Sequence, residues 1–497
     1  MGGGDEAGRL RRVKIRCIGA ERHEPEQGVT NVSRRLAALT AAMGVLAAVL
    51  VTGAGVRTVM HTSRAPRLLT EGIAAQPCAP QDVIIVAAHR DVRYDGASSV
   101  LLPAARATPG CTVASVAASQ RWLAAGTVPG TGPAMRSMAE RALLDLHLSV
   151  RPDGAVVAGW YPGWDYAWPR DSSWVAGALA VTRHGADALR VLTFLQKEQS
   201  RDGTWAARYE PDGGGPVRDG RPVELDAVGW VPWAAWSWYE ADRSPAARRE
   251  LARLWPMVSA AANAAEQSLT PGGLPVAATD YWEHGTQVTL GTAAPLLTGL
   301  RAAADIAGAL ARKPAAQDWS DAAARLSTSV QASFGCYGFN RLPDDSSGPD
   351  ASVTFLGPPF GPASAALERA EEATERALTL PGGGDLPGAD WPGDTATAWT
   401  AETAFFALFD AASGEDRRAS TLLSWLAAHR TALGALPEQV TAAGRPASVA
   451  PLAWTDAAVL LTLVAQARPL PATPVPPGGQ PAPAGGCLLP PLTVVGR

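Results

Sequence analysis

The stretch Asp165-Tyr-Ala-Trp-Pro-Arg-Asp-Ser-Ser-Trp-Val-Ala-Gly-Ala-Leu-Ala-Val181 joins a charged, aromatic motif to an apolar segment with helical spacing. Trp174, Ala178 and Val181 recur at i, i+4 and i+7, which places their side chains on one face of an α-helix. Turns that contain glycine and proline separate further segments of the same kind as far as residue 467. The sequence therefore predicts a succession of helices over residues 121–467.

These helices are short enough, and the turns between them frequent enough, to form consecutive helical hairpins. Hairpins that close into a ring give an α/α barrel in which inner and outer helices alternate. The long loops of such a rigid scaffold are the usual place for binding residues. We therefore expect an all-α fold, with helices near residues 133–149, 170–184, 186–200, 224–241, 244–267, 287–312, 315–332, 362–379, 394–412, 415–430 and 449–467.

The composition excludes some classes of function. The chain has 497 residues, of which 47% are apolar, and a formal net charge of −4. A nucleic-acid-binding protein would need an excess of basic residues to neutralise phosphates, so we expect no nucleic-acid partner. No spacing of cysteine and histidine is typical of a zinc site, and we expect no metal.

The N-terminus is typical of a targeting sequence. Residues 36–56 are uncharged, and eight basic residues precede them within residues 1–35. At about 1.5 Å per residue this segment is long enough to cross a bilayer as a helix. The positive-inside rule then places residues 1–35 in the cytoplasm and the chain beyond Arg57 outside. Both a transmembrane signal anchor and a cleaved signal peptide fit, so we expect a catalytic domain that is membrane-bound or secreted.

Residues 57–120 and 468–497 flank the helical region. The first segment contains the β-branched run Val83–Val86, which could pair with residues 98–102, so we expect a linker or a small β-rich prelude there. The second is rich in proline, and we expect a disordered tail. Four cysteines lie beyond the targeting segment and allow three disulfide pairings. Cys78 with Cys111 is the most local pairing and the one we favour.

Two carboxylate motifs lie in predicted loops of the helical region. They are Asp280-Tyr-Trp-Glu283 and Leu436-Pro-Glu-Gln439. Two separated glutamates among many tryptophans suit a pocket that binds a sugar and cleaves its glycosidic bond. One carboxyl group would protonate the leaving oxygen, and the other would activate water or attack the anomeric carbon.

Taken together, the motifs resemble those of glycoside hydrolase family 15, the glucoamylase-like enzymes with relatives that act on dextran and trehalose. The resemblance covers residues 121–467 and implies an (α/α)6 barrel, an inverting mechanism on α-glucosides and no cofactor. It rests on the order of five motifs: Asp165-Tyr-Ala-Trp-Pro-Arg-Asp171, Gln199-Ser-Arg-Asp-Gly-Thr-Trp-Ala-Ala-Arg-Tyr209, Asp280-Tyr-Trp-Glu283, Pro437-Glu-Gln439 and Pro451-Leu-Ala-Trp454.

The resemblance also implies roles for particular residues. Glu283 would be the general acid and Glu438 the general base. Arg170 and Asp171 would hold sugar hydroxyls, although Asp171 could instead stabilise a helix N-terminus. An apolar setting beside Tyr281 would keep Glu283 protonated through desolvation. Flat faces for the sugar would come from Trp168, Trp282 and Trp454, whereas we expect Trp230, Trp233, Trp236 and Trp238 to lie in the core.

Two departures from the family pattern leave the substrate open. The family commonly has a second acidic residue after the acid, where this chain has His284. Many bacterial members also carry a large β-sandwich before the barrel, where this chain has about 60 residues. Our interpretation is an exported or membrane-anchored hydrolase of oligosaccharides or polysaccharides with α-glucosidic bonds. A trehalase of the same family and a glycan-binding barrel without activity are the alternatives, and the sequence leaves the oligomeric state open.

Overall fold

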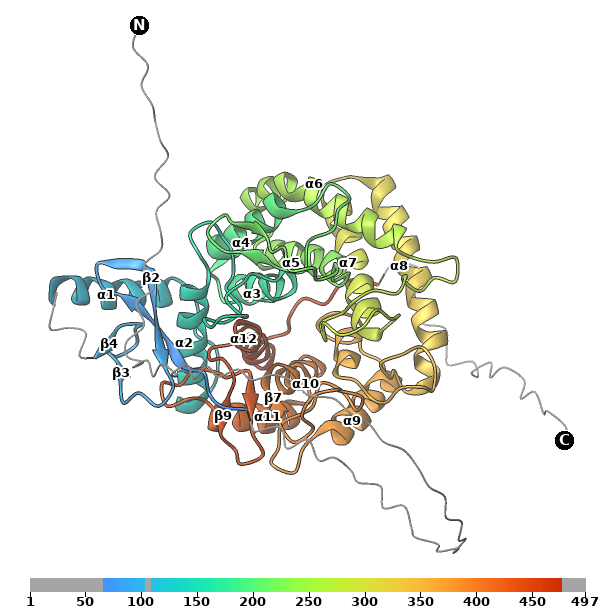
Figure 1. The fold of residues 1–497 in the computed structure, drawn as a ribbon. Coiled ribbons are helices and arrows are strands. Elements are labelled where there is room, and N and C mark those ends of the chain that lie inside the picture. The colour runs from blue at the N-terminus through green and yellow to red at the C-terminus, as the bar shows by residue number, and fades with distance from the viewer. Residues whose placement is uncertain (1–65, 103–108, 476–497) are drawn as a thin grey trace, which may run out of the picture. The chain divides into compact units, whose positions relative to one another are not determined.

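The computed structural model describes residues 66–102 and 109–475, and its main feature is a ring of buried helices (Figure 1). Five helices have nearly every residue buried. α3 packs on α5 and α12, α5 also packs on α7, and α10 packs on α12. The five inner helices are α3 (Pro169–Val181), α5 (Ala227–Ala241), α7 (Leu290–Ala309), α10 (Thr400–Ser413) and α12 (Ala453–Ala467).

A short 3-10 helix completes this ring between α7 and α10. All six residues of η3 (Ala351–Leu356) are buried, and η3 contacts both neighbouring helices. The side chain of Asp350 caps it by accepting a hydrogen bond from the Ser352 backbone N–H at 2.8 Å. Such caps satisfy backbone donors at the start of a helix, which stabilises even a short one. The sequence analysis did not predict η3, because six residues are too few to show a helical period.

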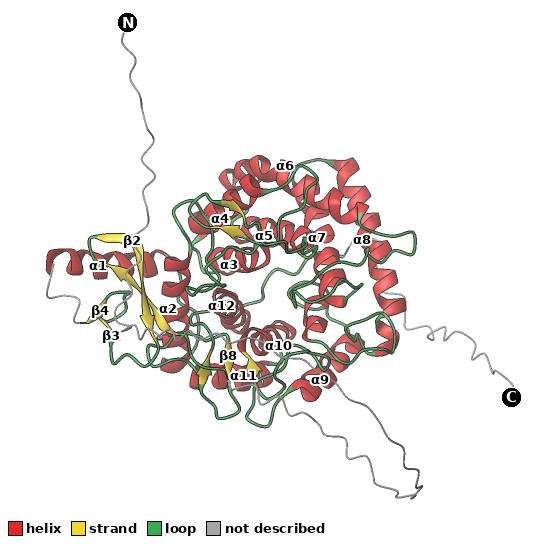
Figure 2. Cartoon of the chain, in the orientation of Figure 1, coloured by secondary structure: helices red, strands yellow, loops and turns green. Residues whose placement is uncertain are grey.

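Six longer helices surround the ring (Figure 2). Five of them bury mainly one face, whereas α2 is buried on all sides over its second half. In α4, for example, Val191, Phe194 and Leu195 are buried, whereas Lys197 is exposed. Along the described chain, outer and inner elements alternate six times, which is the order of an (α/α)6 barrel. The outer helices are α2 (Gly132–Ser149), α4 (Gly185–Glu198), α6 (Pro245–Gln267), α8 (Lys313–Ser333), α9 (Ala365–Leu378) and α11 (Asp416–Ala428).

Each of the eleven predicted helices corresponds to a helix within a few residues. The four tryptophans of α5 are buried, which confirms that they belong to the core. Two of them, Trp230 and Trp233, pack with Trp174 and with phenylalanines in tilted or edge-to-face geometry, for example Trp174 and Trp230 with ring centroids 5.3 Å apart. The barrel is therefore filled by aromatic side chains, which leaves its loop end for the chemistry.

The segment before the barrel contains strands, but one predicted pairing is wrong. β1 (Thr70–Gln76) pairs antiparallel with β2 (Ala79–Ala87), with Val83 opposite Ala75. Val83–Val86 therefore does not pair with residues 98–102. The two-residue turn after β1 places β2 beside β1, so that Val83–Val86 pairs with β1 instead. Two short strands, β3 (Arg93–Tyr94) and β4 (Leu101–Leu102), pair with each other instead. The helix α1 (Pro109–Ala125) follows and crosses position 120, where we had expected the barrel region to begin.

Cys78 and Cys111 form a disulfide, which confirms the favoured pairing. It joins the β1–β2 turn to α1. The predicted cytoplasmic residues 1–35, the targeting segment 36–56 and most of the tail 468–497 lie outside the described residues. Within residues 66–102 and 109–475, no helix has both the length and the apolarity that crossing a membrane requires. The membrane or secreted location stays a prediction.

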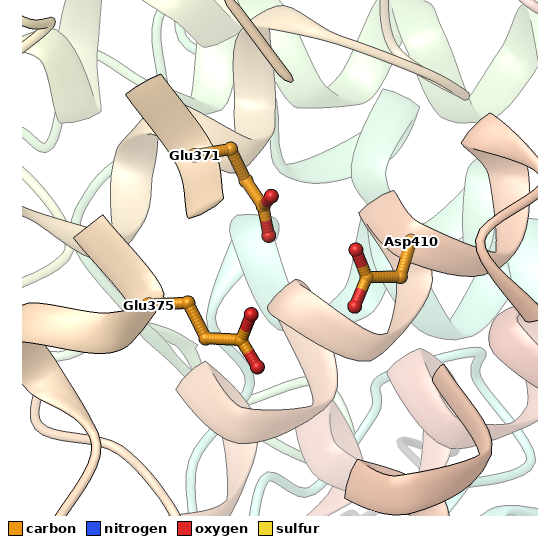
Figure 3. A group of neighbouring side chains, drawn as sticks. All are labelled: Glu371, Glu375 and Asp410. Atoms are coloured by element: carbon orange, nitrogen blue, oxygen red, sulfur yellow. The ribbon is translucent and has the colours of Figure 1, made fainter. Parts of the chain in front are cut away.

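Three carboxylates converge where α9, α10 and α11 meet (Figure 3). Carboxyl oxygens of Glu371, Glu375 and Asp410 lie within 4.8 Å of one another. Arg418 of α11 forms ion pairs with all three, at 3.0 Å to Glu371 and 3.0 Å to Asp410. Burial raises the pKa of Glu371 to about 8 and that of Asp410 to about 9. The guanidinium of Arg418, together with protons bound to Glu371 and Asp410, thus neutralises this ion cluster. The cluster holds the outer helices α9 and α11 to the inner helix α10.

Candidate active site

The seven residues predicted to act on a sugar line one cavity of about 420 Å³. They come from four separate parts of the chain: the segment that enters α3, the loop before α7, the segment before β8 and the start of α12. The helical ring brings the N-terminal ends of α3, α10 and α12 to this cavity, since each contributes residues of its first turn. The seven residues are Trp168, Arg170, Asp171, Trp282, Glu283, Glu438 and Trp454.

Glu438 is held by a small sheet and by two hydrogen bonds. It directly precedes β8 (Gln439–Val440), which lies between β7 (Ala398–Trp399) and β9 (Pro446–Ala447). The indole N–H of Trp164 donates to Oε1 of Glu438 at 2.9 Å, and the hydroxyl of Ser448 donates to Oε2. Desolvation raises the pKa of Glu438, and the two hydrogen bonds oppose that rise. Both donors favour the carboxylate, which is the form that a general base requires.

The loop that carries Glu283 is anchored by buried charges. Arg341 donates to Asp280 at 2.9 Å and to Asp350, the cap of η3, at 3.1 Å. The hydroxyl of Tyr281 donates to Asp350 at 2.9 Å, and the guanidinium of Arg341 lies 3.6 Å from the Trp282 ring centroid. The backbone N–H of Glu283 closes the turn by donating to the Asp280 carbonyl at 2.8 Å. Asp280 of the motif therefore has a structural role, which the sequence did not reveal.

Glu283 has a more polar setting than the sequence analysis predicted. Its neighbours Tyr281 and Trp282 are buried in the core, but the side chain of Glu283 is 27% exposed in the cavity wall. It forms an ion pair with Arg170 at 3.7 Å and a second ion pair with Arg221. The expectation of an apolar setting is wrong, because the chain turns at Glu283 with φ 55° and two guanidinium groups meet it there.

Arg170 is the centre of a buried charge network. Its guanidinium lies 2.5 Å from Glu224, 3.4 Å from Asp226 and 3.5 Å from Asp171. Burial alone would lower the pKa of Arg170, but the three carboxylates raise it overall. Removing Arg170 would leave buried carboxylates without a cation, so the folded state and the cavity both depend on it. Sequence reasoning missed Glu224 and Asp226, which stand 54 and 56 residues further along the chain.

Several residues that line the cavity were not among the predicted site residues. Trp282, Trp391 and Trp399 form a row of edge-to-face rings with centroids 5.1 Å apart at each step. Trp391 lies in a loop rich in glycine and proline, and a tryptophan in such a loop is itself a signal for binding. The other cavity residues missed are Trp164, Arg208, Arg221, Trp399 and Glu402. His284 is exposed and does not line the cavity.

The cavity wall has polar atoms that no protein group satisfies. The indole N–H groups of Trp168, Trp282 and Trp454 are buried without a hydrogen-bond partner among the described residues. Unpaired buried donors are costly, and a ligand rich in oxygen acceptors would satisfy them. Aromatic faces, carboxylates and guanidinium groups complete the lining. This is a combination that suits a sugar, which presents hydroxyl groups and patches of C–H to its site.

Comparison with known proteins finds the same fold in several glycosidases. Over 355 residues the chain is 25% identical to an uncharacterized glycosyl hydrolase of Methanocaldococcus jannaschii, covering 65% of this chain and 55% of that protein. A glycosidase variant in complex with glucose has a TM-score of 0.59 at 20% identity, covering 68% of this chain and 99% of that chain. A glucoamylase from Saccharomycopsis fibuligera has a TM-score of 0.55 at 13% identity, covering 67% and 94%.

A bacterial glucoamylase in complex with acarbose also shares the fold, with a TM-score of 0.55 at 18% identity and coverage of 67% of this chain and 55% of that chain. At these identities the likeness to solved structures establishes the fold alone. No protein-family model matches the chain. The chain spans about half the length of the curated relative that it matches.

Proposed function

We propose that this protein is a glycoside hydrolase that cleaves α-glucosidic bonds with inversion, in the manner of a glucoamylase, and that residues 36–56 direct it out of the cytoplasm. The observation that carries the proposal is the single cavity lined by both Glu283 and Glu438 together with four of the aromatic residues expected to bind sugar or support it. The shared fold with glycosidases, among them one in complex with glucose, supports the same class of reaction.

In the proposed mechanism Glu283 protonates the glycosidic oxygen as the bond to the anomeric carbon breaks. Glu438 accepts a proton from a water molecule that attacks the opposite face of the sugar ring. Trp164 and Ser448 stabilise Glu438 as the carboxylate before the reaction. Arg170 and Asp171 lie in the same wall and would hold hydroxyl groups of the sugar through charge-assisted hydrogen bonds.

The stereochemistry of the first product tests this proposal. If water attacks directly, an α-glucoside releases β-glucose first, and proton NMR in the first minutes of hydrolysis separates the anomers. We expect β-glucose from at least one of maltose, maltotriose, isomaltose and dextran. Initial α-glucose would contradict the role of Glu438 as a base, since retention requires a covalent intermediate. Hydrolysis of trehalose alone would favour the trehalase alternative, and binding without hydrolysis would favour the glycan-binding barrel.

Arg221 pairs with Glu283, whereas a general acid must carry a proton. An adjacent guanidinium stabilises the carboxylate over the protonated acid. Arg221 belongs to the segment between β6 (Gly215–Pro216) and α5, its side chain is 37% exposed, and it also pairs with Asp219 at 3.3 Å. We therefore expect Arg221→Met to keep Glu283 protonated to higher pH, and to move the alkaline limb of kcat/KM upward.

The measurement is a pH profile of kcat/KM for the variant and for the wild type on the best substrate. Arg218→Met is the matched control, because Arg218 is an exposed arginine of the same segment that does not line the cavity. The control should keep the wild-type profile. An alkaline limb that stays in place in Arg221→Met would show that Arg221 does not govern the protonation of the acid.

A further inference from the structure

Glu402 is a third carboxyl group of the cavity, and the backbone ties it to Glu438. It lies in the first turn of α10 and lines the cavity with Glu283 and Glu438. β7 leads directly into α10, and its Trp399 pairs with Gln439 of β8. The backbone N–H of Thr400 donates to the carbonyl of Glu438 at 3.0 Å. The two glutamates therefore stand on segments that are hydrogen-bonded to each other.

The side chain of Glu402 is buried without the partners that a carboxylate needs. It is 4% exposed, and its Oε2 has no hydrogen-bond partner. Among residues 66–102 and 109–475, no arginine or lysine forms an ion pair with it, whereas Glu224 and Asp171 in the same region pair with Arg170. A buried carboxylate with no cation and an unsatisfied oxygen is costly, and protonation removes that cost.

Burial and two neighbouring carboxylates raise the pKa of Glu402, and the guanidinium of Arg170 opposes them. Burial is the main cause that raises the pKa of Glu402 to about 8, and the carboxylates of Glu438 and Asp350 raise it further. A hydrogen bond from the backbone N–H of Glu402 itself and the charge of Arg170 oppose this rise. Arg170 is also paired with Glu224, Asp226 and Asp171. Tyr281, which also faces this group, is neutral, because burial raises its pKa well above the usual value.

A protonated carboxyl group is a hydrogen-bond donor, as are several indole N–H groups of this wall that have no protein partner among the described residues. The indole N–H groups of Trp168, Trp282 and Trp454 line the same cavity without a protein acceptor. Sugar hydroxyl oxygens would accept from all of them. We propose that Glu402 is a substrate-binding residue that acts as a neutral carboxylic acid and donates a hydrogen bond from its O–H group to a hydroxyl oxygen of the bound sugar beside Glu438. This inference rests on the proposed function.

Two substitutions separate a donor from an acceptor at this position. Glu402→Gln keeps the shape and supplies amide N–H donors, whereas Glu402→Leu has a similar volume and no donor. At pH 6 we expect Glu402→Gln to retain kcat/KM and the Kd of glucose within about threefold, and Glu402→Leu to weaken both at least tenfold. Equal losses in both variants would overturn the proposal, because they would mean that Glu402 acts as a charged acceptor. No loss in either variant would overturn it as well.

The pH dependence of glucose binding, measured by titration calorimetry from pH 6 to pH 9.5, gives a readout that a structural role would not change. In the wild type, binding should weaken above about pH 8 as Glu402 loses its proton. In Glu402→Gln that weakening should disappear. Glu371→Gln is the matched control, because Glu371 is a buried carboxyl with a pKa of about 8 outside the cavity, and it should keep the wild-type dependence. A wild-type dependence in Glu402→Gln would refute the proposal.

The two readouts distinguish this inference from the proposed function. Hydrolysis by the wild type with unaltered behaviour of both Glu402 variants would leave the hydrolase standing and remove the role of Glu402. Binding of glucose without hydrolysis of any substrate, with the pattern expected for the variants, would support the role of Glu402 and contradict the hydrolase. A wild-type protein that neither binds nor hydrolyses any of the saccharides would contradict both.

Discussion

Replacing Glu438 with glutamine should lower kcat by about 10²–10⁴-fold, which is the usual contribution of a positioned general base. The amide keeps the shape of the side chain and can still accept a hydrogen bond from Trp164 or Ser448, but it cannot accept a proton from water. KM should change little, because the variant keeps the cavity that binds the sugar. Steady-state kinetics on the best α-glucoside measures both quantities, and thermal unfolding checks that the fold is intact.

The matched control is Ser448→Ala, which keeps the carboxylate and removes one of its two hydrogen bonds. Losing a bond to the charged form should raise the pKa of Glu438 further. Because a base acts only when it is deprotonated, the acidic limb of the pH profile should then move to higher pH while kcat at the optimum stays close to the wild-type value. A Glu438→Gln variant that keeps its kcat within tenfold of the wild type would exclude Glu438 as the base.

Replacing Arg418 with methionine should destabilise the barrel by about 3 kcal/mol, at the lower end of the range for breaking a buried ion pair because Arg418 is 30% exposed. The substitution leaves Glu371, Glu375 and Asp410 without a cation where α9, α10 and α11 meet. Chemical denaturation gives the free energy of unfolding. Arg376→Met is the matched control, since its pair with Glu372 is exposed, and it should cost at most about 1 kcal/mol.

The pH dependence of the destabilisation by Arg418→Met follows from the raised pKa values of Glu371 and Asp410. The folded state holds the protons of Glu371 up to about pH 8 and of Asp410 up to about pH 9, whereas the unfolded chain releases them near pH 4. Between these limits the folded state binds more protons, so these groups make the free energy of unfolding fall as the pH rises. The deficit of Arg418→Met should therefore be small at pH 5 and larger at pH 8.5. An equal deficit at both pH values would contradict an electrostatic role for Arg418.

The helical ring was largely predictable because each helix carries its own signal. Inner helices such as α12 are apolar all round, and outer helices such as α4 bury one face, so spacing and composition indicate each of them locally. The exceptions are η3, which is too short for a period, α1, which lies largely in the segment expected to be a linker or β-rich prelude, and the β1–β2 hairpin, where a local turn decided the pairing. Most helices were thus predictable from the pattern of residues within them. The elements that were not predicted have a weak or ambiguous local pattern.

The residues of the candidate site were only partly predictable from the sequence. Both Glu283 and Glu438 were identified through short motifs that resemble those of a known family, since each motif is a property of neighbouring residues. Glu402 did not stand out, since a single acidic residue in the first turn of an apolar helix is common and favourable. Only the pairing of β7 with β8 and the contact of Thr400 with Glu438 place it in the cavity wall. In the same way, only the folded chain shows that Arg221 contacts Glu283.

The sequence by itself thus determined the helical class of the fold and the identity of the two carboxylates proposed to act on a sugar, because apolar periodicity and short motifs are properties of neighbouring residues. The tertiary structure alone decided the pKa values and the ion pairs of the carboxyl groups in the site. Burial without a cation raises the pKa of Glu402 to about 8, and convergence on Arg170 places a cation beside Glu224 and Asp226. The charge of a carboxyl group depends on its distance from other charges and from water, and those distances exist only once the ring has closed.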